Sequence, residues 1–134
     1  MTRRKNFKKL AMYLMKFRSR KDRRFDMDWF DDDPSRSMTR TNCGTCGCAL
    51  GHGPYAGIPK RSGETWHQYA HRAFVLLDEH GTWDCWNWCF SPLWSGNDNT
   101  AKGAAKRILW MLKHGIPHNY RDQIEGNAKL CYEK

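Results

Sequence analysis

The segment Asp98–Pro117, DNTAKGAAKRILWMLKHGIP, carries the best-defined helix signal in this chain of 134 residues. Side chains of residues 98–100 are of the kind that caps the first turn of a helix. Apolar positions then recur at helical spacing, at Ala101, Ala104, Ala105, Ile108, Leu109 and Leu112. Gly115 and Pro117 follow in the order that ends a helix. The sequence therefore predicts a capped amphipathic helix that stops before Gly115.

Two further helices are predicted outward from this one. The N-terminal stripe has the spacing of a helix with one buried face, and it consists of Phe7, Leu10, Ala11, Leu14 and Phe17. Thr65 and Gln68 have the spacing of a capping box. The stripe that follows them comprises Trp66, Tyr69, Ala70, Ala73, Phe74 and Leu77. Gly81 is a natural stop for this helix.

The rest of the chain is less regular. Glycines and prolines punctuate residues 43–59, which leave room for at most one brief helix at Thr45–Leu50. The Trp-rich stretch 82–94 favours a short helix interrupted by Pro92, and the single Val argues against a large sheet. We expect a mainly α, small single-domain helical fold around a Trp-rich core, with a Gly/Pro-rich central loop. Residues 1–24 form a basic helix or arm, 25–117 the globular core, and 118–134 a peripheral C-terminal tail.

Positive charge is concentrated at the N-terminus. Residues 1–24 hold eleven Lys or Arg and one Asp, whereas residues 25–134 hold twelve basic and thirteen acidic residues. This distribution argues against a basic coat over the whole body and favours an arm that docks on phosphate or on an acidic protein. Its candidate contacts are Arg18, Arg20, Lys21, Arg23 and Arg24. A solvated helix face is the alternative explanation.

The apolar run Leu10–Met15 is too short for a membrane span or a secretory signal. We therefore expect a cytoplasmic protein without a membrane partner, whose cysteines are mostly reduced.

Five stretches together resemble a family of short proteins encoded mainly by bacteriophages and prophages. They are RFDMDWF (24–30), NCGTCGCALGHGPYAGIP (42–59), WHQYAHRAF (66–74), WDCWNWCFSPLW (83–94) and DNTAKGAAKRI (98–108). The resemblance covers about residues 6–117. The function of this family is unknown, so the resemblance implies a phage accessory protein in the host cytoplasm, a candidate for host interaction or anti-defence activity, and no mechanism. The basic run 18–24 is longer than the family pattern, and Cys46 and His52 stand at positions where the pattern has no invariant residue.

A zinc site is one interpretation of the cysteine cluster. Cys43, Cys46, Cys48 and His52 give C-x2-C-x-C-x3-H, and thiolates with imidazoles are ligands that zinc prefers. Further ligands are available in the Cys85/Cys89 pair and in His67 and His71. The alternative is that these cysteines are small buried apolar residues.

A thiol nucleophile is a second interpretation. Cys43 stands before a possible helix start, His71 would be its base, and Asp84 or Asn87 would orient that base. The order Cys, His, Asp is that of papain-like enzymes. Against this, His71 lies inside a strong helical pattern.

A backbone anion site is a third interpretation, because the turn at Cys43, Gly44 and Thr45 could present several N–H groups to a phosphate. It lacks the lysine spacing of a nucleotide-binding P-loop, and glycines that simply permit tight turns explain it equally well.

The tryptophans Trp86, Trp88 and Trp94 are either core residues or an exposed surface for a partner or a stacked base. With no complete catalytic set, we expect a protein that binds a host macromolecule or an anionic ligand, either a nucleotide or a nucleic acid. A zinc-stabilised module and a papain-like enzyme are the alternatives.

Overall fold

The computed structural model describes residues 3–18, 24–25, 46–47, 49–74 and 84–133, and this part of the chain is mainly helical. The α-helices are α1 (Arg3–Met15), α2 (Trp66–Ala73), α3 (Asp84–Phe90), α4 (Ala101–His114) and α5 (Tyr120–Glu125). Single 3-10 turns are η2 (Leu50–His52), η3 (Pro54–Ala56), η4 (Pro92–Gly96) and η5 (Cys131–Glu133). Two short strands, β1 (Arg24–Phe25) and β2 (Cys46–Gly47), pair in parallel. The expected fold class is confirmed.

Helix α4 begins and ends where its sequence predicts. The Thr100 side chain accepts a hydrogen bond of 2.9 Å from the backbone N–H of Gly103, and Gly115 ends the helix at a φ of 82°. The capping box of α2 is complete, because the Thr65 side chain accepts from the Gln68 N–H and the Gln68 side chain accepts from the Thr65 N–H. The short helix expected within residues 82–94 is α3, and Pro92 begins η4 after it.

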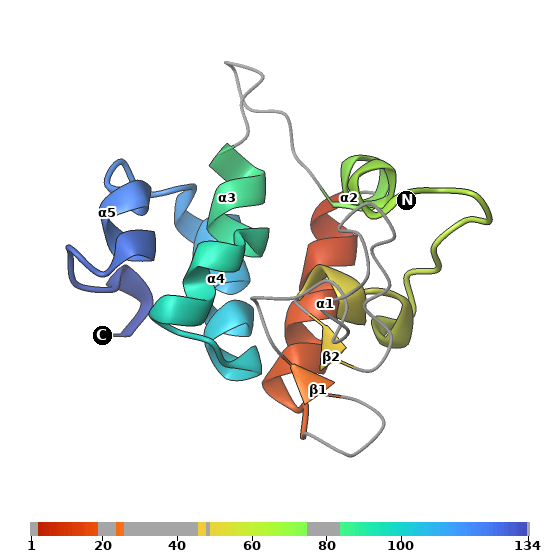
Figure 1. The fold of residues 1–134 in the computed structure, drawn as a ribbon, viewed down its shortest axis with the longest axis horizontal. Coiled ribbons are helices and arrows are strands. Elements are labelled where there is room, and N and C mark those ends of the chain that lie inside the picture. The colour runs from red at the N-terminus through yellow and green to blue at the C-terminus, as the bar shows by residue number, and fades with distance from the viewer. Residues whose placement is uncertain (1–2, 19–23, 26–45, 48, 75–83, 134) are drawn as a thin grey trace, which may run out of the picture.

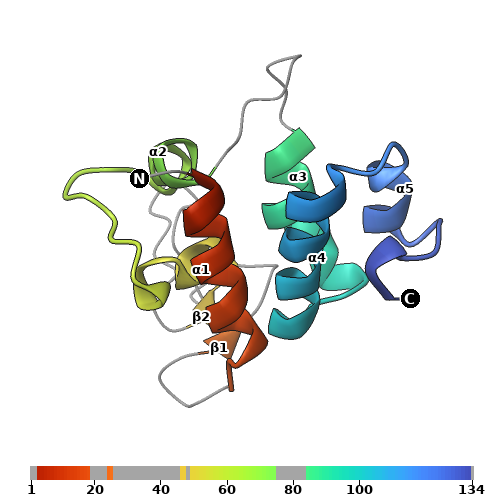
Figure 2. The same cartoon turned by 180° about the vertical axis from the view of Figure 1, so that it is seen from behind.

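Helices α1 and α4 pack along each other in the most extensive helix contact of the structure. Figure 2 shows α4 between α1 on one side and α5 on the other, with α3 behind it, and Figure 1 shows α3 from the front. The apolar face of α1 is buried, and the Phe7 ring packs against Phe74 at a tilt of 52° and stacks on Phe90, at centroid distances of 5.3 and 6.0 Å. The aromatic core thus joins α1, α2 and α3.

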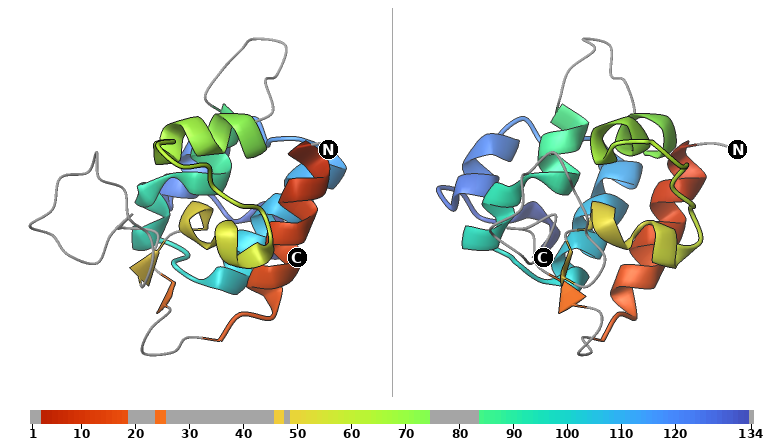
Figure 3. Two further views of the ribbon diagram at one scale, coloured as in Figure 1. Left: turned by 90° about the vertical axis from the view of Figure 1, so that its right-hand side faces the viewer. Right: turned by 45° about the vertical axis from the view of Figure 1, so that its right-hand side comes forward.

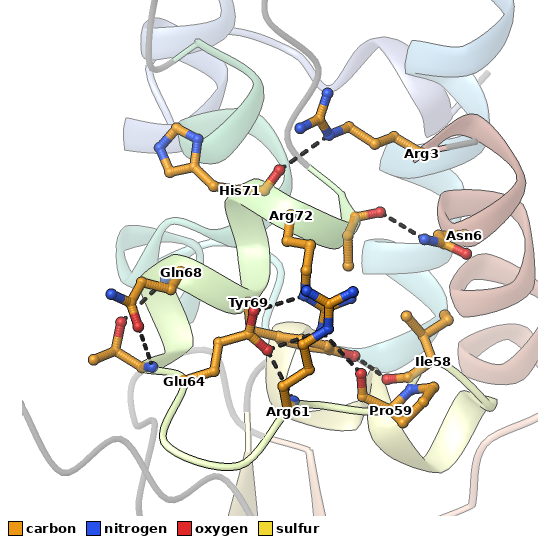
Figure 4. A network of polar contacts seen from close by, with 12 residues as sticks. Arg3, Asn6, Ile58, Pro59, Arg61, Glu64, Gln68, Tyr69, His71 and Arg72 are labelled. Atoms are coloured by element: carbon orange, nitrogen blue, oxygen red, sulfur yellow. Dashed lines mark hydrogen bonds and ion pairs between the residues drawn. The ribbon is translucent and has the colours of Figure 1, made fainter. Parts of the chain in front are cut away.

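Polar contacts fasten α2 to the loop before it and to α1 (Figure 4). Arg72 donates to both carboxylate oxygens of Glu64, at 2.6 and 2.8 Å, and Asn6 of α1 donates to the Ala73 carbonyl. The ion pair holds the pKa of Glu64 at about 2. Figure 3 shows η2 and η3 beside α1 and α2, where they replace the brief helix predicted at Thr45–Leu50. That prediction is wrong, because Cys46–Gly47 is extended in β2 and closely spaced glycines and a proline leave room only for single turns.

The C-terminal segment is part of the core, contrary to the expectation of a peripheral tail. Tyr120, Ile124, Leu130 and Tyr132 are each at most 9% exposed and belong to the main apolar cluster. Four such side chains bury enough apolar surface to hold an otherwise polar segment in place. The globular core therefore extends to Tyr132.

Candidate functional site

The predicted cysteine cluster lies mostly outside the described residues. Cys43, Gly44, Thr45 and Cys48 are not described, and Cys46 is described only through its backbone in β2. The His52 ring is fully buried beside the aromatic rings of Tyr13 and Phe17, the latter at 4.7 Å. No group of three His, Cys, Asp or Glu side chains in the described part of the chain is arranged to hold a metal ion. The zinc and backbone-anion hypotheses therefore stay predictions.

Two of the residues predicted for a thiol enzyme, His71 and Asp84, are described in the structure. His71 is exposed on α2, and its backbone carbonyl accepts a 3.0 Å hydrogen bond from Arg3. Asp84 begins α3 and accepts a 2.6 Å hydrogen bond from the hydroxyl of Tyr120. Cys43 lies outside the described residues, so this hypothesis also stays a prediction.

The second cysteine pair is part of the core. Cys85 and Cys89 are buried on α3, and both thiols contact the sulfur of Met111 at 3.8 and 3.6 Å. Burial raises the pKa of the Cys89 thiol well above its ordinary value. This thiol is therefore held in its protonated, unreactive form.

The proposal that Trp86, Trp88 and Trp94 form an exposed surface is wrong. Trp88 and Trp94 are fully buried and pack edge to face at 5.4 Å, while Trp86 is 9% exposed and stacks with the ring of His67. Each of the two fully buried indoles donates its N–H to a backbone carbonyl. These indoles are core residues because large aromatic side chains with satisfied N–H groups stabilise a small core.

Of the predicted arm contacts, Arg18 is exposed just beyond the end of α1. Arg24 is described only through its backbone in β1, and Arg20, Lys21 and Arg23 lie outside the described residues.

The structure instead packs together two basic helices, α1 and α4, that lie far apart in the sequence. Neither α1 nor α4 contains an Asp or Glu, while α1 carries five Lys or Arg and α4 carries four. Their packing creates a surface that we call the basic face, formed by Arg4, Lys5, Lys8, Lys106 and Lys113. All five of these side chains are exposed.

Two hollows lie along this face, one on each side of the ridge made by Leu109 and Lys113. The first, of about 370 Å³, lies between α1 and α4 and is lined by Arg4, Lys5, Lys8, Leu109, Leu112 and Lys113. The Arg4 guanidinium also donates to the Leu112 carbonyl at 2.6 Å, which ties α1 to the end of α4. Among the described lining residues there is no acidic side chain, so the hollow favours an anion.

The second hollow, of about 400 Å³, lies between α4 and η5. It is lined by Lys106, Leu109, Trp110, Lys113, His114, Cys131 and Tyr132. Trp110 is only partly buried, and its ring lies 4.1 Å from that of His114, at 36° between the planes. This hollow thus combines two lysines with a pair of aromatic rings, and no Asp or Glu stands among the described residues that line it.

A buried cluster around Arg107 holds α4 in position beneath this hollow. The Arg107 guanidinium lies 4.0 Å from the Trp94 ring centroid, and its Nη1 donates to the Tyr132 hydroxyl at 3.0 Å. The same hydroxyl donates to Asp98 at 2.8 Å, and Asp98 lies 3.6 Å from Arg107 Nη1. Burial lowers the pKa of Arg107, while Tyr132 and Asp98 oppose this shift. The cluster joins α4, η4 and η5, so we regard Arg107 as a structural residue.

No protein-family model, no curated protein and no solved structure matches this chain. Among the described residues, no helix has both the length and the apolar character needed to cross a membrane.

The sequence of α4 contains a pattern that indicates this basic face but is not visible in the net charge of chain segments. Lys102, Lys106, Trp110 and Lys113 recur every three or four residues and so share one side of α4. The pairing of this side with α1 could not be predicted, because it depends on contacts between distant parts of the chain.

Proposed function

We propose that this protein acts by binding, and that its ligand is the phosphate backbone of a nucleic acid held on the basic face. The observation that carries the proposal is the packing of two basic, acid-free helices side by side, with a hollow between them. Lysine and arginine side chains that neutralise phosphates supply most of the sequence-independent affinity of nucleic-acid-binding proteins. An accessory role during phage infection, in the host cytoplasm, belongs to the same proposal and rests on the family resemblance alone.

A nucleic acid fits this surface better than an acidic protein does. The basic side chains are spread over two helices that pack side by side in antiparallel orientation and do not surround a single point, which suits a linear row of charges. Leu109 and Leu112 line the first hollow between the charged groups and offer apolar contact to sugars. Arg18 adds one more exposed positive charge just beyond the C-terminal end of α1.

Salt dependence of binding tests the proposal. If all five side chains of the basic face meet phosphates, the logarithm of the association constant should fall against the logarithm of salt concentration with a slope between about −3 and about −5. Fluorescence anisotropy with a labelled oligonucleotide measures this slope. The double variant Lys8→Ser, Lys113→Ser should make the slope shallower by about 1.5.

A matched control has the same net charge as the double variant Lys8→Ser, Lys113→Ser. The double variant Arg61→Ser, Lys129→Ser removes two exposed charges that line neither hollow. It should leave the slope within error of the unchanged protein. Equal effects of the two double variants, or no oligonucleotide binding by the intact chain at low salt, would overturn the proposal.

A further inference from the structure

Trp110 differs from the other described tryptophans in its exposure. Trp66, Trp86, Trp88 and Trp94 are all at most 9% exposed, whereas Trp110 is only partly buried. It lies on the side of α4 that carries Lys106 and Lys113. Exposing part of a large aromatic ring forgoes burial that the core would otherwise gain, so a partly exposed indole among lysines suggests a ligand contact.

The second hollow supplies the remaining parts of a base-binding site. The ring of His114, which is exposed, packs against that of Trp110 with the centroids 4.1 Å apart and the planes tilted by 36°, and we call this ring pair the aromatic platform. Lys106 and Lys113 lie before and after Trp110 along α4, and their backbone positions are about 10 Å apart along the helix axis at a rise of 1.5 Å per residue. Phosphates on either side of a stacked base can therefore each meet an ammonium group.

We infer that the preferred ligand is a single strand, with one unpaired base stacked on the Trp110 and His114 platform and its flanking phosphates on Lys106 and Lys113. This inference rests on the proposed function, since it assigns a substrate class to the same basic face. Stacking on an aromatic side chain requires an accessible base face, which a duplex hides and a single strand offers. Stacking tolerates any base, so little sequence preference is expected.

The position of the platform is fixed by the fold and does not depend on ligand. Tyr132 lines the hollow with its ring, while its hydroxyl is held by Arg107 and Asp98. Trp110 lies one turn beyond Lys106 and one turn before His114 on a capped helix. A preformed site of this kind loses little conformational entropy when it binds.

Anisotropy measurements with an oligothymidine strand and a duplex of equal total charge test the inference. The intact chain should bind the strand more tightly than the duplex. Trp110→Leu, which keeps an apolar side chain but removes the ring, should weaken strand binding between about 5-fold and about 100-fold. It should leave the salt slope and the duplex affinity unchanged, whereas Trp110→Phe should retain most of the strand affinity.

Two measurements locate the effect and guard against misfolding. Thermal unfolding should show that Trp110→Leu is folded at the temperature of the binding assay. In the intact chain, bound strand should slow alkylation of the partly exposed Cys131, whose thiol lines the same hollow, as read by mass spectrometry.

The results of these binding measurements distinguish a failure of the stacking site from a failure of the proposed function. Equal affinity for strand and duplex, or strand binding unchanged in a folded Trp110→Leu variant, would overturn the stacking site and leave backbone binding intact. An intact chain that binds neither strand nor duplex at low salt would overturn the proposed function itself.

Discussion

Replacing Tyr132 by phenylalanine would remove one hydroxyl group from the buried cluster around Arg107 and leave the aromatic ring in place. The hydroxyl accepts a hydrogen bond from Arg107 at 3.0 Å and donates one to Asp98 at 2.8 Å. Both partners are charged, and hydrogen bonds to charged groups contribute about 1.5 to 3 kcal/mol each. The variant therefore tests whether the C-terminal segment is fastened to α4 through this one oxygen atom.

The decrease in the free energy of unfolding of Tyr132→Phe should lie near the lower end of that range. Asp98 retains its hydrogen bond from Thr100 at 2.7 Å, and the Arg107 guanidinium retains its contact with the Trp94 ring. Arg107 Nη1 also keeps the Asp98 backbone carbonyl at 3.3 Å. We expect Tyr132→Phe to lower the free energy of unfolding by about 2 kcal/mol, because a fully buried cation loses its best partner.

Urea unfolding followed by circular dichroism measures this change, with Tyr120→Phe as the matched control. The Tyr120 hydroxyl also donates to a carboxylate, that of Asp84, but this carboxylate is partly exposed. Water can replace the lost bond there, so the control should lose about 1 kcal/mol or less. Equal losses in the two variants, or no loss in Tyr132→Phe, would refute the assignment of Arg107 and Tyr132 as the anchor of the C-terminal segment.

Two further predictions concern stability. Gly103→Ala should lower the melting temperature, because the added Cβ would overlap the Asp98 carboxylate. Alanine is normally more favourable than glycine in a helix interior by about 1 kcal/mol, so the overlap must outweigh this gain. A raised melting temperature would show that Asp98 moves aside without cost. Glu64→Gln should lower the free energy of unfolding by about 1 kcal/mol at neutral pH, since the Arg72 pair is partly exposed. The pKa of Glu64 is depressed from 4.5 to about 2, so the pair stabilises the protein above pH 4.5 and this contribution disappears as the pH falls toward 2. Urea unfolding at several pH values should show the difference between the two proteins shrinking over that window, and a difference that stays constant with pH would contradict the ion pair.

The helices that could be predicted from the sequence are those with a complete local signal. In α2, Thr65 and Gln68 fix the start and the buried side follows at helical spacing, whereas the helix ends at Ala73, earlier than the predicted stop at Gly81. In α4, Thr100 and Gly115 mark both ends. Local capping and periodicity decide such elements because the atoms involved are close in the chain.

The sequence-based predictions were wrong where burial depends on contacts between residues that are distant in the sequence. Tyr120, Ile124, Leu130 and Tyr132 have no regular spacing, so their burial depends on surfaces offered by α3, α4 and η4. Composition alone did not show which tryptophans are exposed, because the exposure of an indole depends on its side of the helix and on that helix's neighbours. The charge count placed the excess in residues 1–24, although the fold sets the lysines of α4 beside them.

The basic face is assembled from helices at opposite ends of the chain, α1 and α4, and so it exists only when the two are packed together. An unfolded chain has the same lysines without their common surface. If the proposed nucleic acid binds only the folded chain, binding and folding are thermodynamically linked, and the ligand at 100 times its dissociation constant should add about 2.7 kcal/mol to the stability of the folded chain. The proteolytic lifetime of the protein would then rise and fall with the concentration of its ligand.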